Sequence, residues 1–199
     1  DQQDKVRLLI DPTSSYAQAA AMAMGRAMDD VIIAAATGTA FTGETGATST
    51  AAQTAIAAGG AGLTIAKLRT AKQTFDLASV DPSIPRHIVV GPEQITNLLS
   101  TTEVTSSDFN TVKALVQGEI DSFLGFKFTV SNRLAKSGND RTCIAFAQDG
   151  ITLAIGKDVS ARIDERADKS YATQVYYCQS IGATRMEEAK VLGIVCQEA

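Results

Sequence analysis

Residues 12–36 are the part of the sequence that most limits how this chain can fold. Asp11 and Pro12 suit the cap and the first position of a helix, and the residues after them include one Gly and no further Pro. Ala and Met, both strong helix formers, dominate the stretch, and its apolar residues recur at helical spacing. A helix of about 24 residues measures roughly 36 Å. The sequence therefore predicts one long helix as its first element.

Residues 37–63 have a different composition. Gly, Ala and Thr make up 21 of these 27 positions, and Glu44 carries the only charge. Such a segment buries little apolar area to offset the entropy lost on ordering. We expect a flexible surface loop that gains order against a neighbour, and a plain disordered linker is the alternative.

A second helix is expected from Thr64 to about Ala78. Its predicted apolar side comprises Ile65, Leu68, Ala71, Phe75 and Leu77, and its predicted solvent side comprises Lys67, Arg69 and Lys72. The turn residues 81–85, which include two prolines, indicate an internal boundary. We then expect a buried strand at 86–91, a helix at 92–99 begun by Pro92, and a helix near 110–118.

From Phe123 onward the hydrophobic period changes from that of a helix to that of a strand. Strands are expected at 126–130, 151–155, 171–184 and 189–196, where Val, Ile, Tyr, Phe and Thr are frequent. Helices gather early and strands late, without a regular alternation of the two. This order predicts an α+β fold.

Composition excludes several classes of function. Eighteen basic and 22 acidic residues give a net charge of −4, which disfavours a large electrostatic surface for nucleic acid. A single His and three Cys are too few for most metal sites, and no bound metal or cofactor is expected. We expect Cys143, Cys178 and Cys196 to be reduced thiols, buried as small hydrophobic residues. The longest uncharged stretch, 45–66, is too polar to span a membrane.

No catalytic constellation emerges from the sequence. His87 is the only imidazole and stands at the expected start of a strand, so a structural or surface role is expected for it. An enzyme that uses His87 as its base is one alternative to a structural protein. A binding module that recognises a ligand through residues 37–63 is another.

The densest charge lies between Lys157 and Lys169, with four residues of each sign. A mixed run of this kind can be a solvated face, or it can be a strip of salt bridges between subunits, where opposed charges fix register. A mixed strip can complement a copy of itself. The residues expected at a subunit interface are Arg162, Glu165, Arg166 and Lys169.

The order and spacing of several motifs resemble those of the major capsid proteins of tailed bacteriophages. The motifs are Asp11–Tyr16, Ala27–Asp30, Glu103–Gly118, Phe123–Arg133, Ile163–Arg166, Lys169–Gln174 and Gly182–Glu188. Each motif alone has low specificity for the family, but together the motifs cover nearly the whole chain outside the Gly/Ala/Thr segment.

The resemblance implies a Hong Kong 97-like fold, with a long spine helix, a peripheral-domain sheet and an axial domain. On this analogy residues 1–85 belong to the peripheral domain, with the spine helix and a flexible loop. Residues 86–150 form the axial domain, and 151–199 return to the peripheral domain and close the core between the two. The family's N-terminal arm and extended loop precede the spine helix, so we expect both to lie outside this sequence.

The resemblance also implies a function. We expect a non-enzymatic protein that assembles in the host cytoplasm, as hexamers and pentamers, into the icosahedral capsid of a virion enclosing double-stranded DNA. Portal, scaffolding and decoration proteins are further implied partners, DNA contacts without sequence specificity are expected, and no membrane is. An encapsulin-type compartment, with the same fold around a protein cargo, is the alternative.

Overall fold

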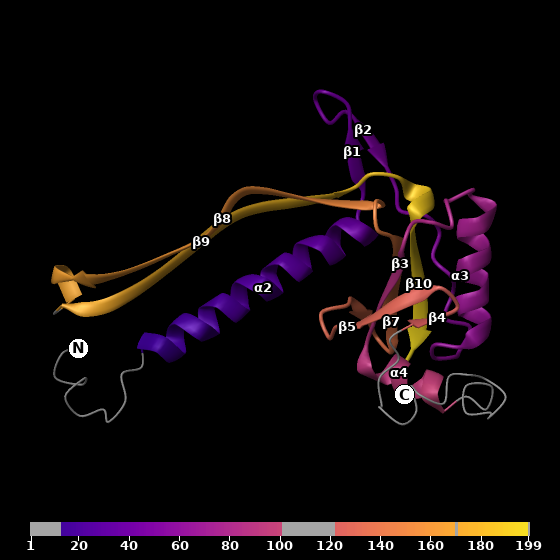
Figure 1. Ribbon diagram of the computed structural model, residues 1–199, viewed down its shortest axis with the longest axis horizontal. Helices are drawn as coiled ribbons and strands as arrows, with labels where there is room; N and C mark the ends of the chain where they lie inside the picture. The colour runs from indigo at the N-terminus through magenta and orange to yellow at the C-terminus, as the bar shows by residue number, and fades with distance from the viewer. Residues whose placement is uncertain (1–12, 101–121, 170, 199) are drawn as a thin grey trace. The chain divides into compact units, whose positions relative to one another are not determined.

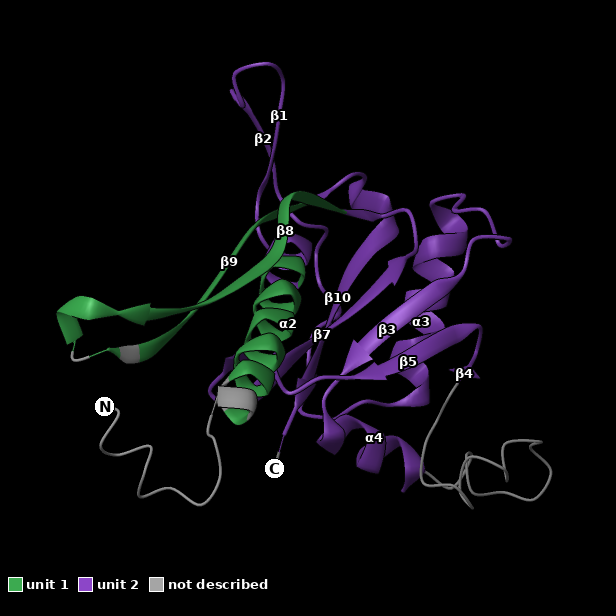
Figure 2. Cartoon of the chain, turned by 60° about the vertical axis from the view of Figure 1, so that its left-hand side comes forward, with its two compact units in different colours: residues 1–32, 153–183 green, residues 33–152, 184–199 purple. Residues whose placement is uncertain are grey.

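The computed structural model describes residues 13–100, 122–169 and 171–198, which form two compact units (Figures 1 and 2). Unit 1 combines residues 1–32 with 153–183, and unit 2 combines 33–152 with 184–199. The N-terminal Asp–Pro cap and the helix expected near 110–118 lie outside the described residues. The units differ from the ranges 1–85, 86–150 and 151–199, whose peripheral and axial assignments stay predictions.

Unit 1 contains most of the long helix α2 (Thr13–Thr37), so the prediction of one long helix is confirmed. With it lie most of two long strands, β8 (Ile151–Arg166) and β9 (Ala172–Arg185), which form a two-stranded sheet and are joined through the 3₁₀ helix η1 (Ala167–Lys169). Tyr177 donates its hydroxyl hydrogen to the Ala17 carbonyl at 3.1 Å, and Gln179 donates to Met24 at 3.4 Å. Alternation along a strand puts Tyr177 and Gln179 on one face of β9, which contacts α2.

Unit 2 is built on a six-stranded sheet in the order β10-β7-β3-β5-β4, with β6 paired to β7 (Figure 1). Among these strands β3 and β5 pair in parallel, and the other described pairs of the sheet are antiparallel. The strands are β3 (Arg86–Val90), β4 (Ser122–Phe123), β5 (Phe126–Val130), β6 (Lys136–Ser137), β7 (Asp140–Ala147) and β10 (Val191–Gln197). The helices are α3 (Ile65–Leu77), α4 (Pro92–Leu99) and the short 3₁₀ helix η2 (Glu188–Lys190).

The core of unit 2 lies where α3 packs on the sheet. The rings of Phe75 on α3 and Phe126 on β5 are fully buried, with centroids 6.0 Å apart. Four of the five expected apolar residues of α3 are buried, but Leu77 is exposed at the end of the helix, so that part of the prediction is wrong. The Thr64 side chain caps the helix by accepting from the Lys67 backbone N–H.

The segment 37–63 is more regular than the expected loop. It contains a short hairpin, β1 (Ala40–Thr42) paired with β2 (Thr48–Thr50). Further along, Ile56 bridges to Ile194 of β10, with backbone hydrogen bonds of 2.9 Å to Gly193 and Val195. The segment takes this form because backbone hydrogen bonds, which need no large side chains, supply its contacts.

Strand β7 was not expected from the sequence, although it pairs with β10, β3 and β6. Its last residues are buried with little alternation, which is typical of a strand covered on both faces. The other large difference is the length of β8, which continues well beyond the expected 151–155 through the charged residues. The α+β fold itself is confirmed.

Candidate assembly surfaces

The four residues expected at a subunit interface lie in one part of unit 1. Arg162, Glu165 and Arg166 are on β8 and Lys169 ends η1, and all four are exposed. Because neighbouring residues of a strand point to opposite faces, Arg162 and Arg166 share one face of β8 and Glu165 lies on the other. The structure thus brings the residues to one end of the β8–β9 hairpin but does not align them as a single row.

Arg166 already has a partner within its own chain. Its Nε donates to the Asp168 carboxylate at 2.9 Å, and this guanidinium lowers the pKa of Asp168 below its ordinary value. An exposed pair of this kind contributes little to folding. The hairpin therefore carries its charges to solvent without depending on them for stability.

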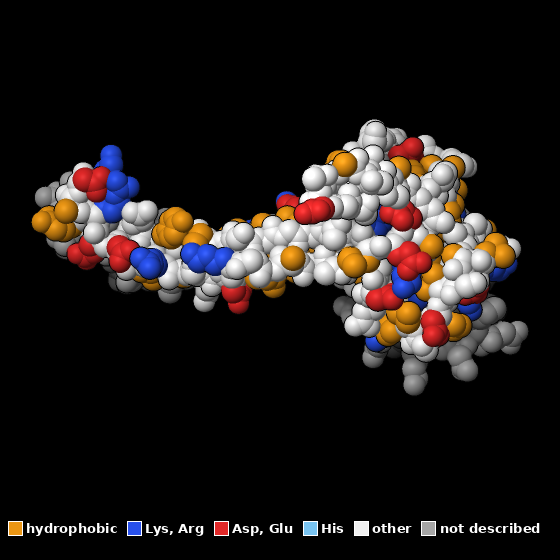
Figure 3. All heavy atoms as spheres, turned by 90° about the horizontal axis from the view of Figure 1, so that it is seen from above, with side chains coloured by type: hydrophobic (Ala, Val, Ile, Leu, Met, Phe, Trp, Pro, Cys, Tyr) orange, Lys and Arg blue, Asp and Glu red, His pale blue; other side chains and the backbone are white. Residues whose placement is uncertain are grey.

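Hydrophobic side chains are exposed among these charges. Ile163 is 53% exposed and Tyr176 51%, and Ile155 and Tyr171 are exposed to a similar degree. Figure 3 shows hydrophobic and charged side chains interspersed along unit 1. A mixed surface of aromatic, aliphatic and charged groups is typical of one that another protein covers.

Cys178 on β9 departs from the expected burial, because it is only half-buried. Its sulfur lies 2.9 Å from the Ser160 hydroxyl oxygen and 3.2 Å from the Lys157 ammonium nitrogen. The contact with Ser160 and then that with Lys157 lower the pKa of the Cys178 thiol. Cys143 and Cys196 are buried free thiols, as expected.

Four charged residues of the described part of unit 2 are buried, namely Lys67, Arg86, Arg185 and Glu198, and sequence patterns did not reveal their roles. Lys67, expected on the solvent side of α3, is one of them, so that prediction is wrong. Its ammonium group donates to the carbonyls of Ala61 at 2.7 Å, Gly62 at 2.9 Å and Val195 at 2.9 Å. Lys67 therefore ties the end of the Gly/Ala/Thr segment to α3 and β10.

Arg185, at the end of β9, likewise joins separate backbone segments, here at the end of α2 and in β2. Its guanidinium donates to the carbonyls of Ala36 at 3.1 Å, Gly38 at 2.7 Å and Thr50 at 3.1 Å. These bonds fix the two chain segments from which the β1–β2 hairpin emerges.

Glu198 anchors the last described residues. Its carboxylate pairs with Arg141 and Lys136 and accepts from Gln94 at 3.2 Å. Arg141 first, and then Lys136, hold the pKa of Glu198 at about 2. A lone Glu near the end of a sequence carries no signal of this role, because its partners come from three separate elements.

His87 has the structural position that the sequence favoured. It lies opposite Phe146 in the β3–β7 register, and the two rings stack with centroids 5.6 Å apart. Within the described residues no group of three or more His, Cys, Asp or Glu side chains could hold a metal ion. No helix in those ranges is long and apolar enough to cross a membrane.

Solved capsid structures from several phages have this fold. The Mycobacterium phage Che8 structure superposes with a TM-score of 0.70 at 20% identity, over 98% of this chain and 66% of that one. The cyanophage P-SCSP1u capsid gives 0.71 at 16% identity, over 98% and 69%. The cyanophage Pam1 capsid gives 0.67 at 14%, over 100% and 72%. This chain spans about two thirds of the length of these relatives.

These likenesses define the class of protein: an α+β chain with the Hong Kong 97-like fold of tailed-phage capsids. The family model for phage capsid proteins matches residues 1–198, and the chain belongs to that family. No curated protein sequence matches it. It is a structural protein of the virion capsid, the shell of the phage head, and not an enzyme. Since a capsid is built from many copies, the protein associates with itself.

Proposed function

We propose that copies of this chain assemble as hexamers and pentamers into an icosahedral shell that encloses double-stranded DNA. The family match over residues 1–198 is the observation that carries the proposal. Portal, scaffolding and decoration proteins are the further partners it implies, and assembly would take place in the host cytoplasm. In this proposal unit 1 supplies the spine helix and the peripheral strands, and residues 86–150 belong to the axial domain.

The β8–β9 hairpin is the proposed contact between neighbouring subunits. In the part of the chain that the structure describes, each of its strands has only the other as a sheet partner, and β8 has no buried residue. Its exposed Ile and Tyr side chains give a neighbouring subunit apolar area to bury. Arg162, Glu165, Arg166 and Lys169 would then select register rather than supply most of the affinity.

The net charge of the chain supports weak, non-specific contact with the enclosed DNA. A net charge of −4 disfavours a broad basic surface for phosphates. A shell of such subunits can hold DNA without binding it tightly, and no contact with a particular base sequence is needed.

Sedimentation of the purified protein, followed by negative-stain microscopy of the fastest fraction, tests the proposal. We expect megadalton particles of uniform diameter, and nuclease-resistant DNA inside particles taken from infected cells. Uniform particles that hold protein cargo and no DNA would favour an encapsulin-type compartment instead. The same measurement is repeated on a longer version of the protein that includes the further segments found in its relatives, with scaffolding protein present. If that version stays monomeric, the result contradicts the proposal.

A further inference from the structure

The β1–β2 hairpin of unit 2 presents one carboxylate to solvent. Its turn runs from Gly43 to Gly46, both with positive φ, and the Gly46 N–H donates to the Gly43 carbonyl at 3.1 Å. Glu44 lies within this turn and is exposed. Phe41, on the strand just before it, is 66% exposed. No hydrogen bond or ion pair in the described part of the chain involves Glu44, so the hairpin displays an acidic and an aromatic side chain together.

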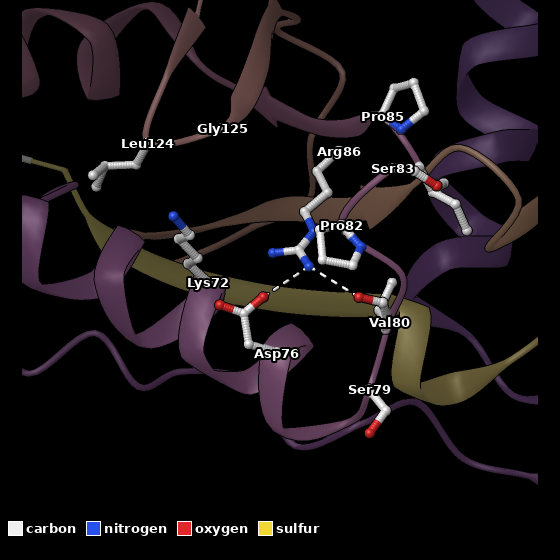
Figure 4. Close-up of a pocket in the computed structure, with 11 residues that line it drawn as sticks. Lys72, Asp76, Ser79, Val80, Pro82, Ser83, Pro85, Arg86, Leu124 and Gly125 are labelled. Carbon is white, nitrogen blue, oxygen red and sulfur yellow. Dashed lines mark hydrogen bonds and ion pairs between the residues drawn. The ribbon is translucent and has the colours of Figure 1, made fainter.

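A pocket of about 490 Å³ on another part of unit 2 has the opposite character. It lies between α3, the turn 79–85 and the Leu124–Gly125 turn (Figure 4). Val80, Pro82, Ile84 and Leu124 give it apolar walls. Its volume is in the range of sites that take one or two side chains or a small ligand.

Two cations and one carboxylate line this pocket. Arg86 is only 7% exposed and donates to Asp76 at 2.8 Å and to the Val80 carbonyl at 3.1 Å. Its Nε has no hydrogen-bond partner among the described residues. Lys72 extends from α3 beside Asp76 (Figure 4) and forms no ion pair or hydrogen bond within the described ranges. With Asp76 neutralised by Arg86, the pocket retains one uncompensated positive charge and a buried donor without a partner.

We propose that this pocket receives the β1–β2 hairpin of a second copy of the chain, with Glu44 at Lys72 and Phe41 against the apolar walls. Charge complementarity carries the choice of occupant, because the single charge of the segment 37–63 is negative and the pocket's uncompensated charge is positive. In both Figure 1 and Figure 2 the hairpin projects away from α3 within unit 2, so it does not fill the pocket of its own chain. The proposal rests on the self-assembly proposed above and adds a specific contact to it.

Zero-length cross-linking with a carbodiimide tests the contact directly, because the reagent joins a carboxylate to an amine that it touches. Particles are assembled from an equal mixture of ¹⁴N- and ¹⁵N-labelled protein, cross-linked and analysed by mass spectrometry. We expect a Glu44–Lys72 peptide pair containing both isotopes. A pair that always carries a single isotope would mean that the contact lies within one chain, and would overturn the proposal. Particles without any Glu44–Lys72 pair would also overturn it.

A charge-exchange cycle gives an independent measurement. Glu44→Lys and Lys72→Glu should each raise the protein concentration needed for half-maximal assembly by about fivefold or more, the effect of losing one modest interaction. The double variant restores an opposite-charge pair and should return close to the parent value. Lys127→Glu, an exposed substitution on β5 outside the pocket, is the matched control. Arg86 is left intact because its burial makes it part of the fold.

The outcomes separate this contact from the proposed function. If the parent protein forms no particles under any condition, self-assembly fails and the contact fails with it. If particles form equally well from the parent and from both single variants, the contact is refuted and shell formation stands. Loss in both single variants without recovery in the double variant would also refute the pairing.

Discussion

The six-stranded sheet of unit 2 and the β8–β9 hairpin of unit 1 differ in how their strands are paired and buried. Four of the eight residues of β7 are buried, and this strand has partners on both sides. None of the 16 residues of β8 is buried, and among the described residues β9 is its only strand partner. The central strands of the sheet are covered within one chain, whereas β8 leaves most of its residues exposed and only one face of β9 contacts α2. Contacts within the chain thus stabilise unit 2, and the hairpin has exposed surface that neighbouring subunits can contact.

Charged residues show the same contrast. In unit 2, Lys67, Arg185 and Glu198 are buried and are held by the chain itself. In the hairpin, Arg162 and Glu165 are exposed. A buried charge without a partner is costly, so those in unit 2 must have fixed partners, while exposed charges remain available to other molecules. Substitutions in the two regions should therefore separate folding from assembly.

Truncation of the core of unit 2 should have the largest effect on folding. Phe126→Ala removes a fully buried ring that packs on Phe75, and it should lower the free energy of unfolding by about 3–5 kcal/mol. Ile163→Ala in the hairpin, where the side chain is half exposed, should change it by less than about 0.5 kcal/mol. Denaturant titration of both variants measures the difference. Similar losses would mean that the hairpin is as integral to folding as the sheet.

Removal of the Lys67 charge should have the next largest effect. Lys67→Met keeps much of the side-chain volume but leaves three carbonyls without their donor, at a cost of about 1–3 kcal/mol. Arg69→Met, exposed on the same helix, is the matched control and should be nearly neutral. Denaturant titration gives the stabilities, and amide exchange at residues 56–63 should accelerate in Lys67→Met only. Unchanged exchange there would contradict the role assigned to Lys67.

The difference between Lys67 and its neighbours also shows what the sequence could predict. Capping, helix propensity and apolar spacing are local signals, and they located the helices 13–37, 65–77 and 92–99 within one or two residues. The position of Lys67 depends on Val195, which is 128 residues away. No local pattern contains that contact, and a positive charge alone led to the prediction that Lys67, like Arg69 and Lys72, faces solvent.

The strands divide in the same manner. β3 and β5 alternate or are uniformly apolar and were predicted from the sequence. β7 begins with Asp140 and Arg141, and its last five residues are apolar without alternation, so the period of two that marks a half-buried strand is absent, and its order comes from partners on both sides. The residues predicted at a subunit interface were chosen from one run of charges, but alternation along β8 puts Glu165 on the other face from Arg162 and Arg166.

Acid should weaken unit 2 through Glu198. Because the folded protein holds the pKa of Glu198 at about 2, below its ordinary value of 4.5, the unfolded chain binds the proton more readily between these values. The contribution of Glu198 is thus present above about pH 4.5 and is lost as the pH falls toward 2. Glu198→Gln should flatten this part of the stability profile, and Glu187→Gln, at an exposed ion pair, should not. Parallel profiles for the parent and Glu198→Gln would contradict the assignment.

Reversal of the hairpin's arginines should have the smallest effect on folding and a large one on assembly. Arg162→Glu with Arg166→Glu removes exposed charges and one surface pair with Asp168, so the free energy of unfolding should change by only about 0.5 kcal/mol. If the hairpin contacts a neighbouring subunit, like charges will oppose its binding, and the particle fraction in sedimentation should fall several-fold. The matched control is Arg69→Glu with Lys127→Glu, which makes the same change of net charge at exposed positions of unit 2.

Two outcomes would contradict the assignment of the hairpin as an interface. In the first, the hairpin variant loses stability and assembly to the same degree. In the second, the hairpin variant and the control variant lose assembly equally. A loss of assembly in the hairpin variant alone would show that this surface acts between chains and contributes little within one.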